Sequence, residues 1–194
     1  MKGANAKRLA KNLSKDSHDA GHERARKDYA GTKSRSHTGR KVEDARELPP
    51  LARLVQLLGE EGIRFQMVGM SAAILQGVPA TTIDTDLWVD LPERRYVQLM
   101  KLVKALGGEV LAPTMYALKD GALVNFIFKM TGLKSFDREY ANSKEVSWNG
   151  IKVHVLGLER IYASKKASAR DKDIAHLPLL QRVIDASKRM ERKK

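Results

Sequence analysis

Cysteine is absent from this chain of 194 residues. Its absence excludes disulfides, thiolate catalysis and any zinc site built on cysteine. No apolar run approaches the roughly 18 residues of a membrane-spanning helix, so no membrane partner is expected. The first residues are charged with no apolar segment behind them, unlike a secretory signal, and we therefore expect a cytoplasmic protein.

Several enzyme signatures are missing as well. The sequence holds no GxxxxGK[ST] phosphate loop, no GxGxxG turn, no HExxH metal motif and no GxSxG nucleophile turn. Enzyme classes that depend on those motifs therefore find no support in this chain.

Positive charge is abundant, and it is unevenly placed. The net charge is +13, of which residues 1–47 contribute +6. These 47 residues have few large apolar side chains, so we predict a basic, disordered arm followed by one folded domain over residues 48–194. The charge favours a polyanionic partner such as nucleic acid or nucleotide, although the arm can equally be a solubilising extension.

The most informative stretch begins at Phe65. The apolar run Phe65–Val68 precedes Gly69 and the helix-like run Ser71–Leu75, which predicts a strand, a tight turn and a helix. Such a turn presents backbone N–H groups to an anion, and Ser71 adds a hydroxyl. The pattern therefore predicts a phosphate contact at Gly69 and Ser71.

Two acids follow in the same stretch. Asp84 and Asp86 lie one residue apart and lead into Leu87-Trp88-Val89, which reads as a buried strand. Alternation along a strand puts both carboxylates on one face, about 6–7 Å apart. Two like charges so close call for a divalent cation or a basic partner. These residues predict a site for Mg²⁺ and a nucleoside triphosphate.

Together these residues resemble the signature of the minimal nucleotidyltransferase superfamily, the DNA polymerase β-like proteins. The resemblance lies in Val68 to Ala72, in Gly77 and in Thr82 to Leu87. It extends to bacterial proteins related to the toxin half of abortive-infection and toxin–antitoxin pairs. It spans roughly residues 50–182 and implies an α/β (α+β) fold, a mixed sheet flanked by helices and closed by C-terminal helices.

A second block, residues 155–173, resembles the closing pattern of the same superfamily. By this resemblance Lys165 contacts the phosphates, and Arg170, Lys172 and Asp173 form a salt-bridged junction beside the site. From the residues alone, Lys165 can equally be a solvated side chain on a helix.

The chain departs from the family pattern at two positions. The resemblance implies a third carboxylate on a neighbouring strand, where this sequence has Asn125. An amide supplies no negative charge and cannot act as a base. Met70 stands where the family has a second glycine, which makes close approach of a phosphate less easy. Asp90 and Asp120 are candidate substitutes for the missing acid.

The remaining segments predict further elements of the same domain. Helices are expected at residues 51–58, 92–106 and 135–141, and strands at 109–111, 115–118 and 122–128. Asn149-Gly150, between two β-prone runs, predicts a hairpin. In the last helix we expect an inward face of Ile174, Leu177, Leu180, Val183 and Ile184, followed by a frayed basic end from residue 187.

Two functions stay open on these observations. The first is Mg²⁺-dependent transfer of a nucleoside monophosphate to a hydroxyl of RNA, a protein or a small molecule. Asp84 and Asp86 would bind the metal there, with Gly69, Ser71 and Lys165 at the phosphates. The alternative is a catalytically degenerate module that binds nucleotide or RNA, as one component of a toxin–antitoxin pair with an antitoxin-type protein partner. Asn125 and Met70 favour this second function.

Overall fold

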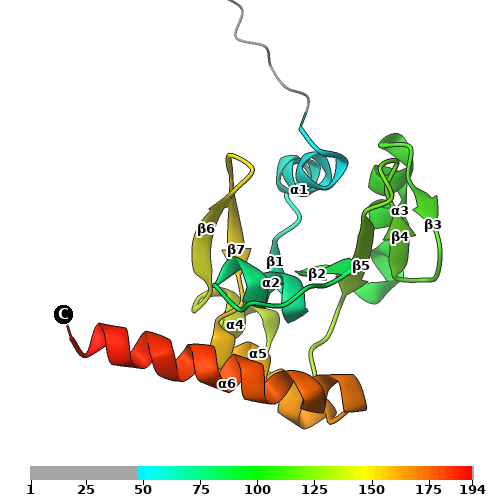
Figure 1. Cartoon of the computed structure of the whole chain (residues 1–194). Helices are drawn as coiled ribbons and strands as arrows, with labels where there is room; N and C mark the ends of the chain where they lie inside the picture. The colour runs from blue at the N-terminus through cyan, green and yellow to red at the C-terminus, as the bar shows by residue number, and fades with distance from the viewer. Residues whose placement is uncertain (1–47, 194) are drawn as a thin grey trace, which may run out of the picture. The chain divides into compact units, whose positions relative to one another are not determined.

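The structure of the protein is a computed structural model that describes residues 48–193, so the predicted basic arm lies outside the described residues. Figure 1 shows the order of the elements along the chain. The helices are α1 (Pro50–Glu60), α2 (Gly69–Leu75), the 3₁₀ turn η1 (Glu93–Arg95), α3 (Tyr96–Ala105), α4 (Phe136–Tyr140), α5 (Leu158–Ser168) and α6 (Asp171–Glu191). The strands are β1 (Phe65–Val68), β2 (Asp84–Val89), β3 (Glu109–Val110), β4 (Met115–Ala117), β5 (Leu123–Ile127), β6 (Lys144–Trp148) and β7 (Ile151–Val155).

Within the described residues the strands form one mixed sheet in the order β3-β4-β5-β2-β1-β7-β6. Strands β1 and β2 are antiparallel, whereas β2 pairs with β5, and β1 with β7, in parallel. The predicted α/β fold with a mixed sheet and C-terminal helices is confirmed. Its two central strands are those that carry the glycine turn and the paired acids.

Strand register decides which side chains share a face of the sheet. Val68 pairs with Asp86, and Asp86 pairs with Asn125 on the next strand. Because side chains at paired positions point to the same face, these three lie in a row across β1, β2 and β5. The parallel pairing of β2 and β5 thus brings Asn125 beside Asp86, although 39 residues separate them.

The opposite face of the central strands is apolar. Met67, Leu87 and Phe126 alternate with the polar row, and all three are buried in the core. In Figure 1, α1 lies above the central strands, and α4, α5 and α6 lie below them. Trp88, on the same face as Asp86, packs edge-on against Phe136 of α4. One face therefore stabilises the sheet, and the other combines packing with polar groups.

Local turn chemistry behaves as the sequence predicts at the β6–β7 hairpin. Asn149 and Gly150 both have positive φ, 49° and 76°, as the tight two-residue hairpin turn requires. Asparagine and glycine adopt this conformation at low cost. The predicted hairpin is confirmed.

Two expectations for the last helix were wrong. Ile174 is exposed, because the first turns of α6 direct the neighbouring Asp173 inward. The segment from residue 187 is helical as far as Glu191, and Lys188 reaches Glu159 of α5 at 3.8 Å.

No helix among residues 48–193 combines the length and the apolarity needed to cross a bilayer.

Gln66 generates a prediction about stability. It is fully buried on β1, and neither side-chain polar atom has a hydrogen-bond partner among the described residues. A buried unpaired amide costs about 1–3 kcal/mol, so Gln66→Met should raise the free energy of unfolding by about that amount. Urea unfolding followed by circular dichroism measures this change.

The matched control for this change is Gln56→Met on the exposed side of α1, which should shift stability by less than about 0.5 kcal/mol. A loss of stability in Gln66→Met would contradict the argument, because it would mean that the amide has a partner, such as a buried water.

Candidate active site

Asp86 is the centre of the polar row. Its Oδ1 accepts a hydrogen bond of 3.0 Å from Nδ2 of Asn125 on β5. Asn125 therefore occupies the position beside the two acids that the family resemblance gives to a third carboxylate. An amide nitrogen donates at this position, whereas a carboxylate would repel Asp86.

Gly69 leaves room for the Asp86 carboxylate. Gly69 has a φ of +66°, and a Cβ added to it would overlap Oδ2 of Asp86. Any other residue would strain the backbone and collide with the carboxylate. Gly69, which the sequence predicts to lie in a phosphate-binding turn, thus also leaves space for a carboxylate of the protein itself.

Asp84 stands two residues before Asp86 on the same strand, and its Oδ1 accepts a hydrogen bond of 2.9 Å from Oγ1 of Thr82. Both acids line one cavity of about 530 Å³ together with Asn125. The remaining residues that line this cavity are Met70, Thr81, Thr82, Ile83, Met115, Ile127, Lys165, Arg170, Lys172, Asp173 and His176.

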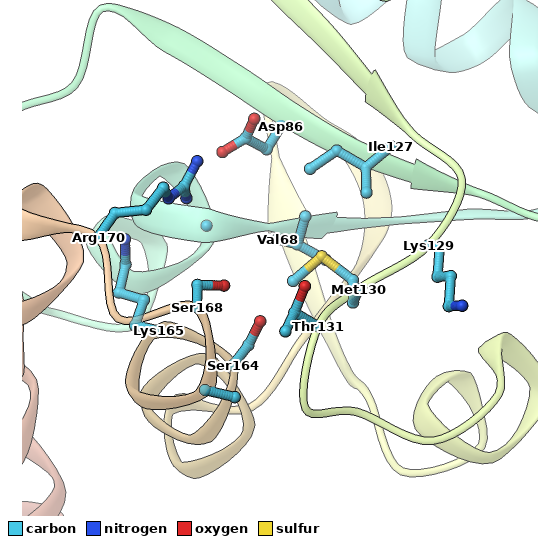
Figure 2. Close-up of a pocket in the computed structure, with 12 residues that line it drawn as sticks. Val68, Asp86, Ile127, Lys129, Met130, Thr131, Ser164, Lys165, Ser168 and Arg170 are labelled. Atoms are coloured by element: carbon cyan, nitrogen blue, oxygen red, sulfur yellow. The ribbon is translucent and has the colours of Figure 1, made fainter.

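A second cavity, of about 410 Å³, shares four lining residues with the first: Asp86, Ile127, Lys165 and Arg170. Figure 2 shows Lys165 and Arg170 on the same side of this cavity, with Asp86 nearby. Its lining includes Lys129, Met130 and Thr131 from the segment after β5. The hydroxyls of Ser164 and Ser168 come from α5. Asp86 therefore contributes to two adjoining cavities.

Asp173 fixes the cations of the site. It is fully buried, and its two oxygens accept hydrogen bonds of 2.8 Å from Lys165 Nζ and 2.5 Å from Arg170 Nε. Ala169, at a φ of +51°, ends α5 in the left-handed conformation and lets α6 begin two residues later. This turn brings Lys165 and Asp173 together across the α5–α6 junction.

Burial and charge act in opposite directions on these acids. Burial raises the pKa of Asp86, the hydrogen bond from Asn125 lowers it, and the nearby charge of Asp84 raises it further. Burial would likewise raise the pKa of Asp173, but the hydrogen bonds from Arg170 and Lys165 outweigh it and lower that pKa. Asp173 is thus satisfied within the protein, while Asp86 is left short of compensating positive charge.

The donor set around Asp86 fits a divalent cation held in part by substrate. Mg²⁺ commonly uses one or two carboxylates and completes its shell with water and phosphate oxygens. Asp84 and Asp86 supply two carboxylates in one cavity, and the raised pKa of Asp86 marks a charge that a cation would neutralise. No group of three or more acids, histidines or cysteines suited to a metal occurs among residues 48–193.

The structure brings together most of the residues predicted for the site. Asp84, Asp86, Asn125 and Lys165 line one cavity, and Gly69 lines the adjoining one. Ser71 lies apart from them, because its hydroxyl donates to the Val68 carbonyl at 3.0 Å and it lines a different cavity, beside Trp148.

The sequence argument missed several residues at the two cavities. Ser164 and Ser168 are spaced i, i+4 on α5 and share the Lys165 side of that helix, a signal that the sequence contained. Thr131 belongs to a loop after β5 that Gly132 lets lie against α5, close to Ala167. His176 of α6 lines the larger cavity. In the sequence it stands among apolar residues, so no motif marks it as a site residue.

Comparison with known proteins identifies the fold. Neither the family models nor the curated proteins give a match to this chain. A solution structure of the antibiotic-resistance factor ANT(2'')-Ia matches with a TM-score of 0.50 at 17% identity, over 72% of this chain and 84% of that one. The lincosamide antibiotic adenylyltransferase LnuA, bound to lincomycin, matches with a TM-score of 0.47 at 11% identity, over 69% and 96%.

A putative nucleotidyltransferase from Thermotoga maritima matches with a TM-score of 0.44 at 21% identity, over 73% of this chain and 88% of that chain. The chain described here has the nucleotidyltransferase fold, as the sequence resemblance implied. The antitoxin-type partner suggested by the same resemblance finds no support in these comparisons and stays a prediction.

The close approach of Gly69 and Asp86 generates a prediction. Gly69→Ala should destabilise the fold by about 1–3 kcal/mol, because it adds positive-φ strain and a collision with the Asp86 carboxylate. Thermal unfolding measures the loss.

Two alanine variants separate the causes of that loss. Gly77→Ala has the positive φ of 91° but open space around it, so it should show the strain alone. Gly59→Ala, inside α1 with nothing near it, should be neutral or stabilising. Equal losses at Gly69 and Gly77 would show that the collision contributes nothing.

Proposed function

We propose that this protein binds a nucleoside triphosphate with Mg²⁺ and transfers the nucleoside monophosphate to a hydroxyl of RNA, a protein or a small molecule. The observation that carries the proposal is a single cavity on a nucleotidyltransferase fold, with Asp84 and Asp86 facing Lys165 and Arg170. Metal ligands and phosphate-neutralising cations are the two components that phosphoryl transfer requires.

In this proposal Asp84 and Asp86 hold Mg²⁺, which when bound neutralises the charge of the triphosphate. Lys165 and Arg170 contact the phosphates from the opposite side. Because both cations are anchored on the buried Asp173, they keep a fixed place and lose little freedom when the nucleotide binds. Gly69 lines the adjoining cavity and keeps the backbone open at the turn.

The proposal predicts that binding depends on Asp86. Mg²⁺–ATP, –GTP, –CTP and –UTP titrated by calorimetry should show saturable binding to the wild-type protein. Asp86→Asn should weaken that binding by at least about tenfold, since it removes a metal ligand with little change in shape. The same weakening should follow from removing Mg²⁺ with a chelator.

Asp86→Asn should not lower stability, which separates lost binding from lost fold. The raised pKa means that the folded chain holds this proton more tightly than the unfolded chain does, so the contribution of Asp86 falls as pH rises through that pKa. At neutral pH the amide should therefore equal or exceed the stability of the acid. Mg²⁺-independent binding, unchanged in Asp86→Asn, would refute the site.

The alternative is a binding module that has lost catalysis, and Asn125 is the observation that favours it. Its amide donates to Asp86 where a third acid would hold a second metal ion. The two functions differ in pyrophosphate release from Mg²⁺–ATP, measured with water and with total RNA as acceptors.

If the protein is an active enzyme, the wild type should release pyrophosphate, and Asn125→Asp should change the rate of release by less than about tenfold. If the protein is a degenerate binding module, the wild type should release no pyrophosphate, and the Asn125→Asp variant should release it. Asn149→Asp, at the exposed turn between β6 and β7, makes the same substitution outside both cavities and serves as control.

A further inference from the structure

Transfer to a hydroxyl needs a group that takes the proton of that hydroxyl. The cavity that holds Asp84 and Asp86 offers an amide, Asn125, at the position beside them. In the proposed function both acids are occupied as metal ligands. The base must therefore be another group that lines the same cavity.

Most of the ionisable groups that line this cavity are cationic or already paired. Lys165 and Arg170 are engaged with Asp173, whose two oxygens are both used as acceptors. Lys172 carries an ammonium group, which donates hydrogen bonds and has no lone pair to accept a proton. Among the described residues around this cavity, His176 is the one side chain that can be neutral and still accept a proton.

The position of His176 follows from the helix that carries it. Lys172, Asp173 and His176 are spaced i, i+1 and i+4 in the first turns of α6, so they lie on neighbouring parts of one side. The buried ion pairs of Asp173 fix the rotation of this helix toward the cavity. The same rotation that exposes Ile174 thus turns His176 inward.

The surroundings of His176 favour the neutral imidazole. Its Nδ1 is buried and has no hydrogen-bond partner among the described residues, so no protein partner fixes which ring nitrogen carries the proton. Burial lowers the pKa of His176, the charges of Lys165 and Lys172 lower it further, and Asp173 opposes them. The His176 side chain lines the same cavity as the paired acids.

We propose that His176 is the general base of the reaction and performs the task that a third carboxylate would perform if residue 125 were an acid. The inference rests on the proposed function. The unprotonated ring nitrogen of the neutral His176 imidazole takes the proton of the acceptor hydroxyl while the acceptor oxygen forms a bond to the α-phosphorus. The bond from that phosphorus to the bridging oxygen breaks, and pyrophosphate leaves with the electron pair.

The first test is pyrophosphate release from Mg²⁺–ATP, with water and total RNA as acceptors, in His176→Gln. Loss of a general base should lower the maximal rate by about 100-fold or more, with little change in nucleotide affinity. His154→Gln is the matched control, since His154 stacks on Tyr140 and contacts Ser143, and it lines neither cavity of the site. Its rate should stay within about threefold of wild type.

The second test is rescue. If His176 replaces a carboxylate missing at position 125, adding Asn125→Asp to His176→Gln should raise the rate of the single variant by at least about tenfold. The pH profile should change with it. The wild-type rate should fall on acidification as the imidazole is protonated, and in the double variant this fall should move toward the lower pH range of a carboxyl group. A purely structural histidine would give neither the rescue nor the shift.

A third readout needs no turnover. In ¹⁵N NMR of the imidazole rings, assigned by comparison with His176→Gln, His176 should titrate below the usual range of histidine near 6.5. Its ring signals should move when Mg²⁺ and a non-hydrolysable α,β-methylene ATP are added, and those of His154 should not. An ordinary titration with no response to the nucleotide would overturn the assignment of the base.

The outcomes separate this inference from the function on which it rests. Nucleotide binding with a wild-type rate in His176→Gln, or with no rescue by Asn125→Asp, overturns the role of His176 and leaves the proposed function intact. Binding without pyrophosphate release in the wild type also overturns the base and favours the binding module. Absence of nucleotide binding overturns both.

Discussion

The carboxylate of Asp86 fits where it does because residue 69 has no side chain. Gly69 follows β1 and begins α2 in a positive-φ conformation, and Asp86 of β2, the antiparallel neighbour of β1, fills the space beside it. The other oxygen of Asp86 is fixed by Asn125 on the parallel neighbour β5. One carboxylate thus links three strands at the level of the cavity.

A buried acid of this kind needs compensation, and the C-terminal helices provide part of it. Asp173 anchors Lys165 and Arg170, and these cations then line both cavities to which Asp86 contributes. The arrangement leaves Asp173 ionised and satisfied, while burial and Asp84 still raise the pKa of Asp86. The negative charge of the paired acids is thus incompletely compensated by the protein, and this is the physical basis for proposing a divalent cation there.

Much of the fold follows from local patterns. The strand before Gly69, the buried strand after Asp84 and the Asn149-Gly150 turn all depend on alternation or on backbone freedom within a few residues. The environment of Lys165 does not: from its helix alone it can be solvated, and only its packing against α6 makes it 12% exposed and paired with Asp173. Likewise Ser71 suits a phosphate turn by type, yet its rotamer places the hydroxyl on the Val68 carbonyl.

The family resemblance alone assigned Asn125 to the position of a third acid. The sequence by itself determined the order of the elements and the two acids that share one face of a strand. These features depend on residue type and on spacings of two to four residues, which the backbone geometry translates directly. The tertiary structure decided which groups meet: Gly69 with Asp86, Lys165 with Asp173, and His176 with the cavity of the paired acids. Such meetings depend on strand register and helix rotation, which are set by the packing of the whole core.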